Sequence, residues 1–124
     1  MIHMKKVLVA EDDEALGSIL KIKLKDAGYE MILAVDGQEA IEKVSTEKPD
    51  LILLDLLMPK KDGYQVLQEL KASADWKNIP VLVTSNLSRP IEIDRIKQLG
   101  ALDYVIKSNE SLDQLVNKIK DVAK

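Results

Sequence analysis

Cysteine is absent from this sequence of 124 residues, and so is any run of about 18 or more apolar residues that could cross a membrane. The N-terminus also lacks the basic and apolar segments of a signal peptide. The absence of cysteine agrees with a reducing compartment, where disulfides are rare. We therefore expect a soluble, cytoplasmic protein, in which residues 1–4 are an expression remnant or an alternative start.

An excess of positive charge is also missing. The sequence has 18 basic and 21 acidic residues, which give a net charge of -3. Direct binding to nucleic acid or insertion into a membrane is disfavoured, because neither a cationic surface nor a long apolar segment is present. Repeats, low-complexity segments and linkers are absent too, so we expect residues 1–124 to form a single domain, with no output domain in this chain. Whether the domain acts alone or was cut from a longer protein stays open.

Short apolar segments that alternate with helical patterns set the fold class. Strands are predicted at residues 7–10, 29–35, 51–54, 81–84 and 102–106. Apolar residues recur at helical spacing after each strand, for example at Leu16, Leu20 and Leu24. Such alternation produces right-handed crossovers and a parallel sheet with helices on both faces. We predict a doubly wound, flavodoxin-like (βα)5 fold of the α/β class, with five parallel strands in the order 2-1-3-4-5.

Polar residues gather at the carboxyl ends of the predicted strands. They are Glu11, Asp12 and Asp13 at the first strand, Asp55 at the third, Thr84 and Ser85 at the fourth, and Lys107 at the fifth. Open α/β sheets bind ligands at this edge, and the first and third strands are neighbours in the predicted order. We therefore expect Asp12 and Asp55 to converge.

Converging carboxylates repel one another, and a hard divalent cation relieves that repulsion. Magnesium fits, because it is typically bound by one or two carboxylates with waters and a phosphate, and no cysteine or histidine is nearby to favour zinc. Thr84 and Lys107 add a hydroxyl donor and a positive charge, which complement a phosphoryl group. The set indicates phosphoryl transfer onto a carboxylate.

Four motifs, in this order and spacing, resemble a known family. They are Val-Leu-Val-Ala-Glu-Asp-Asp (7–13), Leu-Leu-Asp-Leu-Leu-Met-Pro followed by Asp-Gly (53–59 and 62–63), Val-Leu-Val-Thr-Ser (81–85) and Asp-Tyr-Val-Ile-Lys (103–107). The chain is similar to the receiver domain of two-component response regulators, of the single-domain chemotaxis-regulator type. The resemblance covers the sequence from Lys6 to the C-terminus and implies Mg²⁺ as the cofactor.

The resemblance implies a role for each matching residue. Asp55 would accept a phosphoryl group from a phosphohistidine of a histidine kinase or histidine phosphotransfer protein. Asp12 would bind Mg²⁺ directly and Glu11 largely through water. Asp55 and the backbone carbonyl of Leu57 would be further metal ligands. The protein would catalyse its own phosphorylation and dephosphorylation and would not be an enzyme that turns over a separate substrate.

The resemblance also implies a switch. Thr84 would donate its hydroxyl to the phosphoryl oxygens and Lys107 would pair with another oxygen, while the ring of Tyr104 turns inward. The surface around residues 93–99, 102–106 and 112–122 would then bind an unknown downstream protein, with the receiver as a monomer or a phosphorylation-linked dimer. Taken singly, Lys107 could be a solvated cation, Thr84 an ordinary strand residue and Tyr104 core packing. Asp13 could equally be a helix cap.

Three further positions bear on this chemistry. The family lysine is usually followed by proline, often through a cis bond, but Ser108 follows it here. A cis bond before other residues costs about 2.5–4 kcal/mol, so we expect a trans bond and a differently shaped loop. Leu57 and Asn86 stand where the family tunes hydrolysis of the phosphoryl group. Leu57 cannot position a water molecule, so we expect slow dephosphorylation.

Other protein classes share parts of the pattern. A phosphatase of the haloacid-dehalogenase type needs a second acid two residues after its aspartate, where Leu57 stands. A flavodoxin-like cofactor protein needs a phosphate loop rich in Gly, Ser or Thr after the first strand, where this sequence has acids. The alternative that stays open is a pseudo-receiver, which binds protein partners without being phosphorylated.

Overall fold

The computed structural model describes residues 4–86 and 89–123. The predicted N-terminal remnant therefore lies, apart from Met4, outside the described residues. The elements in chain order are β1 (Lys6–Ala10), α1 (Glu14–Asp26), β2 (Glu30–Ala34), α2 (Gly37–Glu47), β3 (Leu51–Asp55), α3 (Gly63–Ala72), β4 (Val81–Ser85), α4 (Pro90–Gln98), β5 (Asp103–Ile106), a 3-10 turn (Lys107–Asn109) and α5 (Leu112–Val122).

The five strands form one parallel sheet in the order β2-β1-β3-β4-β5, which confirms the predicted fold and strand order. Every residue of β3 and β4 is buried, as expected for strands covered on both faces, whereas the edge strand β2 is only partly buried. Within the described ranges, no helix is long and apolar enough to cross a membrane.

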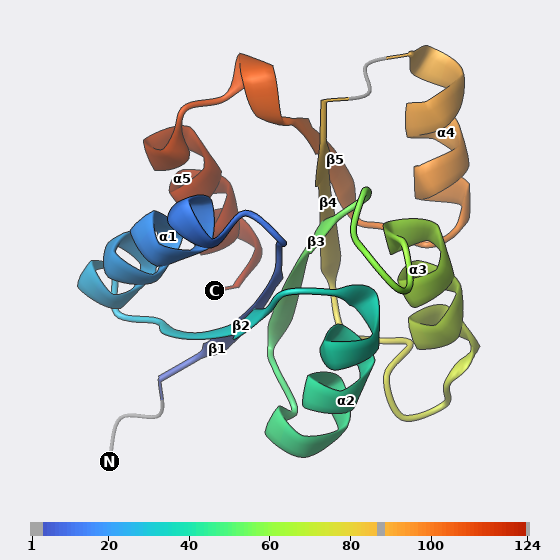
Figure 1. Ribbon diagram of the computed structural model, residues 1–124, viewed down its shortest axis with the longest axis horizontal. Helices are drawn as coiled ribbons and strands as arrows, with labels where there is room; N and C mark the ends of the chain where they lie inside the picture. Colours follow the sequence, from blue (N-terminus) through green and yellow to red (C-terminus); the bar gives the residue numbers. More distant parts are fainter. Residues whose placement is uncertain (1–3, 87–88, 124) are drawn as a thin grey trace.

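Two helical layers cover the sheet. Figure 1 shows α1 and α5 on one face and α2, α3 and α4 on the other. The α1 and α5 face holds an apolar cluster that includes Leu20, Leu24 and Ile119. The opposite face holds a second cluster, to which Leu67 and Ile96 belong. Burial of aliphatic side chains on both faces, at about 25 cal/mol per Å² of apolar surface, is the main force that holds the helices against the sheet.

Short polar side chains start several helices at the carboxyl edge of the sheet. Asp13 accepts a hydrogen bond from the Leu16 amide at the start of α1, so the capping role considered for it is confirmed. Asp36 accepts one from the Glu39 amide at the start of α2. These caps satisfy amide groups that the first turn of a helix leaves without partners. Because the caps fix where each helix begins, they also fix the loops that carry the polar residues.

The register of the sheet brings the polar strand ends to one level. Ala10 pairs with Leu54, so the next residues, Glu11 and Asp55, leave neighbouring strands at the same height. Asp55 in turn pairs with Thr84. Side chains that are far apart in sequence therefore meet at one edge of the sheet.

Candidate functional site

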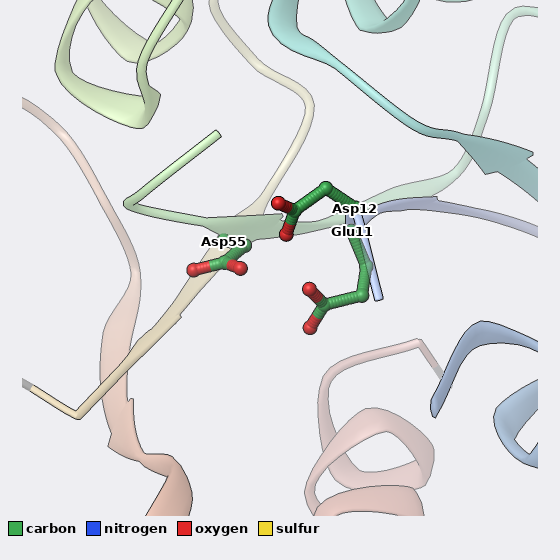
Figure 2. A group of neighbouring side chains, drawn as sticks. All are labelled: Glu11, Asp12 and Asp55. Atoms are coloured by element: carbon green, nitrogen blue, oxygen red, sulfur yellow. The ribbon is translucent and has the colours of Figure 1, made fainter. Parts of the chain in front are cut away.

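Three carboxylates meet at the carboxyl edge of the sheet. Glu11 and Asp55 are buried, with 3% and 5% of their surfaces exposed, whereas Asp12 is exposed. One ligand atom of each residue lies within 4.8 Å of the others. Figure 2 shows the three carboxylates turned toward a common space. The predicted convergence of Asp12 and Asp55 is therefore present, and Glu11 belongs to the same cluster.

Lys107 joins the two buried carboxylates from the end of β5. Its Nζ donates to Glu11 Oε1 at 2.6 Å and to Asp55 Oδ2 at 3.0 Å. The lysine side chain is only 25% exposed, so these pairs are poorly screened by water. The ordinary explanation of Lys107 as a solvated cation is wrong, because its ammonium group lies inside the acidic cluster.

The charges of the cluster shift one another's protonation. Burial raises the pKa of the Glu11 carboxyl; the hydrogen bond from Lys107 lowers it and the neighbouring Asp55 raises it further. For Lys107, burial by itself lowers the pKa, but the hydrogen bonds to Glu11 and Asp55 outweigh it and leave the pKa above its ordinary value. The lysine therefore stays charged beside the acids at neutral pH.

The loop after β3 approaches the site tightly. The Leu57 amide donates to Asp55 Oδ1 at 3.2 Å, which holds that carboxylate in place, while the Leu57 side chain is 60% exposed. A Cβ on Gly63 would lie 2.6 Å from Leu56 Cα and 2.7 Å from the Asp55 carbonyl oxygen. Only glycine fits there, because real Cβ atoms do not approach backbone so closely. The backbone segment predicted to supply a metal-binding carbonyl is thus held firmly beside Asp55.

The residues of β4 and β5 complete the surroundings. Thr84 is buried beside Asp55 in the strand register. Tyr104 is 7% exposed and belongs to the apolar core, so its ring lies inward. Burial raises the pKa of the Tyr104 hydroxyl, and a hydrogen bond with the Ser85 side chain acts in the opposite direction. Core packing is therefore confirmed for Tyr104; its predicted part in a switch stays a prediction.

Two contacts near the site were missed by sequence reasoning. Lys60, whose side chain is 69% exposed, places its Nζ 3.5 Å from Asp36 Oδ2 and so ties the β3–α3 loop to the start of α2. The Ser108 amide donates to Asn86 Oδ1 at 3.1 Å. The expected trans bond after Lys107 is confirmed, since no cis peptide occurs in the described part of the chain. The only sequence signal for the second contact is the missing proline at Ser108.

The donor set fits Mg²⁺. Glu11, Asp12 and Asp55 offer hard carboxylate oxygens from two adjacent strand ends, and Mg²⁺ prefers such ligands and usually keeps several waters. The exposed position of Asp12 leaves the cluster open to solvent on that side. Lys107 neutralises only part of the acidic charge, so the cluster keeps a net negative charge that attracts a cation.

Known proteins are similar to this chain in sequence and architecture. The family described as response regulator receiver domain matches residues 7–120. The alkaline phosphatase synthesis transcriptional regulatory protein PhoP of Bacillus subtilis (strain 168) is 40% identical over 105 residues, which are 83% of this chain and 42% of PhoP. This chain spans less than half the length of the curated relatives that it matches first.

Solved structures agree over almost the whole chain. Chemotaxis response regulator CheY4 of Vibrio cholerae is 28% identical, with a TM-score of 0.89 and coverage of 97% of this chain and 99% of CheY4. The phosphorylated cyanobacterial phytochrome response regulator RcpA is 34% identical, with a TM-score of 0.82 and coverage of 97% and 91%. The family model matches residues 7–120, and the acidic cluster lies at the carboxyl ends of β1 and β3, so this chain belongs to the family of response regulator receiver domains.

Proposed function

We propose that this receiver domain takes a phosphoryl group onto Asp55 from a phosphohistidine, in a Mg²⁺-dependent reaction. The donor would be a histidine kinase or a histidine phosphotransfer protein in the cytoplasm. The observation that carries the proposal is the arrangement around Asp55, a buried carboxylate held by Lys107 at 3.0 Å and by the Leu57 amide at 3.2 Å. Both contacts orient an acid whose burial would otherwise be costly.

The chain's own residues divide the work. Asp55 Oδ1 or Oδ2 attacks phosphorus, and the bond from phosphorus to the histidine nitrogen breaks, so that the electron pair stays on the imidazole. Lys107 moves from the ground-state carboxylate toward an oxygen of the transferred group, and the Thr84 hydroxyl donates to another. Glu11, Asp12, Asp55 and the Leu57 carbonyl would hold Mg²⁺. When bound, the ion supplies positive charge that offsets the repulsion between the acid and the phosphoryl group.

A short series of contacts connects Asp55 to the surface of the domain. Thr84 lies beside Asp55, and Ser85, the next residue, forms a hydrogen bond with the Tyr104 side chain. If the Thr84 hydroxyl moves toward the phosphoryl group, the end of β4 moves with it and changes the packing of Tyr104. The surface of α4, β5 and α5 would then favour a downstream protein partner or a second copy of the domain.

Intact mass after incubation with acetyl phosphate tests the proposal. Wild type in Mg²⁺ should gain about 80 Da, one phosphoryl group. The gain should vanish with EDTA and in Asp55→Asn, which keeps the shape of the side chain. Asp75→Asn serves as a matched control, because Asp75 is exposed and lies in the connection from α3 to β4.

Failure of wild type to gain mass, while a known receiver labels under the same conditions, would overturn the proposal. The chain would then be a pseudo-receiver that binds partners without phosphorylation. Labelling that survives in Asp55→Asn would place the acceptor elsewhere.

The exposed Leu57 side chain bears on how long the phosphoryl group survives. Leucine offers no group that could orient an attacking water molecule, so we expect slow hydrolysis. Leu57→Asn should still be labelled, but its phosphorylated form should decay about ten-fold faster, because an asparagine side chain can position an attacking water molecule. Loss of the mass gain over time measures the rate. An unchanged rate in Leu57→Asn would show that this side chain does not limit hydrolysis.

A further inference from the structure

The side chain of Asn86 ties together the two loops that follow β4 and β5. Its Oδ1 accepts a hydrogen bond from the backbone amide of Ser108 at 3.1 Å, across 22 residues of sequence. Because a backbone amide can only donate, the oxygen of the Asn86 amide group must face it. A proline at position 108 would lack this donor, so the contact depends on the residue that stands here.

The contact continues the pairing of the two strands. Thr84 pairs with Val105 and Ser85 with Ile106, and these are the last pairs of the β4–β5 ladder. Asn86 comes directly after Ser85, and Lys107 directly after Ile106. The hydrogen bond from Ser108 to Asn86 therefore closes the open end of the ladder, at the point where both chains leave the sheet.

Lys107 lies between the ladder and this contact. Its backbone begins the 3-10 turn Lys107–Asn109, and its Nζ reaches Glu11 and Asp55 at 2.6 and 3.0 Å. A lysine side chain has several rotatable bonds, so its ammonium group keeps two short contacts best when its backbone is fixed on both sides. The ladder fixes the side before Lys107, and the Ser108 amide fixes the side after it.

We propose that Asn86 is a positioning residue for Lys107, acting through the amide of Ser108. This inference rests on the proposed function, because it assigns Asn86 to the lysine that would meet the phosphoryl group. In this role Asn86 and Ser108 act as a pair, joined by the one hydrogen bond from the Ser108 amide to Asn86 Oδ1. The predicted influence of Asn86 on hydrolysis would then arise partly from the position of Lys107.

Amide exchange and side-chain NMR on the metal-free, unphosphorylated domain test the contact without any phosphoryl chemistry. Asn86→Ala should speed exchange of the Ser108 amide about five-fold, which corresponds to one ordinary hydrogen bond. The ammonium resonance of Lys107 should shift and exchange faster with water. The Gln114 amide, held by Ser111 Oγ at 3.1 Å, is the internal reference and should not change.

Two substitutions at one position separate the amide from the side chain. Ser108→Ala keeps the amide and should behave as wild type in the Lys107 measurement. Ser108→Pro removes the donor and should reproduce the Lys107 change seen in Asn86→Ala. Adding Asn86→Ala to Ser108→Pro should have no further effect, since the two residues act through the same bond.

Phosphorylation by acetyl phosphate then tests the consequence. Asn86→Ala should label about five-fold more slowly at saturating Mg²⁺, because Lys107 is less well placed. The Mg²⁺ concentration for half-maximal labelling should stay the same, because neither Asn86 nor Ser108 is among the proposed ligands.

Unchanged Ser108 exchange or an unchanged Lys107 resonance in Asn86→Ala would overturn the inference, and so would a Ser108→Ala variant that behaves like Ser108→Pro. These outcomes are distinct from failure of the proposed function. If the proposed function fails, wild type itself will not gain a phosphoryl group, while the NMR measurements will still report whether Asn86 positions Lys107.

Discussion

The two ends of the central sheet treat charge differently. At the amino end, Lys6 Nζ lies 3.5 Å from Glu47 Oε2, and the carboxylate side chain of this pair is 40% exposed. At the carboxyl end, Lys107 serves two carboxylates whose side chains are only 4% and 7% exposed. Exposed ion pairs contribute little to stability, whereas buried ones depend strongly on every partner being present.

The difference shows at which end of the sheet the charges lower the stability of the fold. The amino end could lose a charge with little effect, because water would replace the partner. The acidic cluster at the carboxyl end holds two buried acids and one exposed acid against Lys107, so it keeps unbalanced negative charge in a poorly hydrated place. Such an arrangement is unfavourable for folding, but it attracts a cation. Substitutions at matched positions on the two ends can break or sharpen this contrast.

The largest difference in stability between the two ends is expected from the space around the backbone of two glycines. Gly37, just after the carboxyl end of β2, faces the β3–α3 loop, and an added Cβ would overlap the Lys61 carbonyl oxygen. Gly37→Ala should cost about 3 kcal/mol of unfolding free energy, the upper range for overpacking. Gly28, before the amino end of β2, has a φ of 92° but nothing within 4 Å of an added Cβ. Gly28→Ala should cost about 1 kcal/mol, from backbone strain alone.

Urea unfolding of both variants measures these costs. Equal losses in Gly37→Ala and Gly28→Ala would mean that the β3–α3 loop moves aside without penalty. The loop would then not be held rigidly beside Asp55.

The second largest difference in stability is expected from the loss of a lysine at each end. Lys107→Met keeps most of the aliphatic stem but leaves Glu11 and Asp55 without their shared cation. The expected cost is about 2 kcal/mol in metal-free buffer, below the full value for a buried pair because Lys107 is a quarter exposed. Lys6→Met at the amino end should cost less than about 1 kcal/mol. If the two variants unfold at the same urea concentration, the acidic cluster is better hydrated than its burial indicates.

Removal of an exposed acid from the cluster should increase the stability of the fold. Asp12→Asn reduces repulsion in the cluster and should raise the unfolding free energy by about 1 kcal/mol in EDTA, the size of a like-charge interaction near a surface. Millimolar Mg²⁺ should stabilise wild type, because it binds the folded site, and should stabilise Asp12→Asn less. Glu30→Gln, at the exposed amino end of β2, is the control and should respond to neither condition. Equal stabilisation of wild type and Asp12→Asn by Mg²⁺ would remove Asp12 from the proposed ligands.

The sequence predicts the fold better than it predicts the charge pairing at the site. Strand periodicity and the alternation with helices are local signals, so the class and the strand order could be predicted, with strand ends differing by at most one residue. Convergence of Asp12 and Asp55 followed from the strand order alone. Which carboxylate receives Lys107 did not follow, because that depends on side-chain rotamers and depth. Glu11 lies deeper than Asp12 and takes the lysine together with Asp55.

Sequence patterns could not predict the loop contacts for the same reason. The pairs Lys60–Asp36 and Ser108–Asn86 join segments far apart in sequence, and each depends on a particular loop conformation. Lys60 adopts a φ of 66°, which is uncommon for a residue other than glycine and which no hydrophobic pattern indicates.

The smallest expected effect concerns Tyr64, which connects two helices near the carboxyl end. Its hydroxyl donates to Glu92 Oε2 at 2.6 Å, and the Arg95 guanidinium lies 4.9 Å from the ring centroid, so α3 and α4 are linked through one side chain. The hydrogen bond to Glu92, with help from burial, raises the pKa of Tyr64 to about 12.

The fold favours the protonated form of Tyr64, so this contribution to stability is complete below about pH 10, the unfolded value. It is lost as the pH rises toward 12, the folded value. At neutral pH, Tyr64→Phe should cost about 1 kcal/mol, one hydrogen bond, and in wild type a tyrosinate absorbance step near pH 12 should be present that the variant lacks. Glu92→Gln should move that step toward pH 10, because the amide oxygen accepts more weakly than a carboxylate. A step that stays in place in Glu92→Gln would mean that burial, not the bond between α3 and α4, holds the proton on Tyr64, and α4 would then be free of this tether.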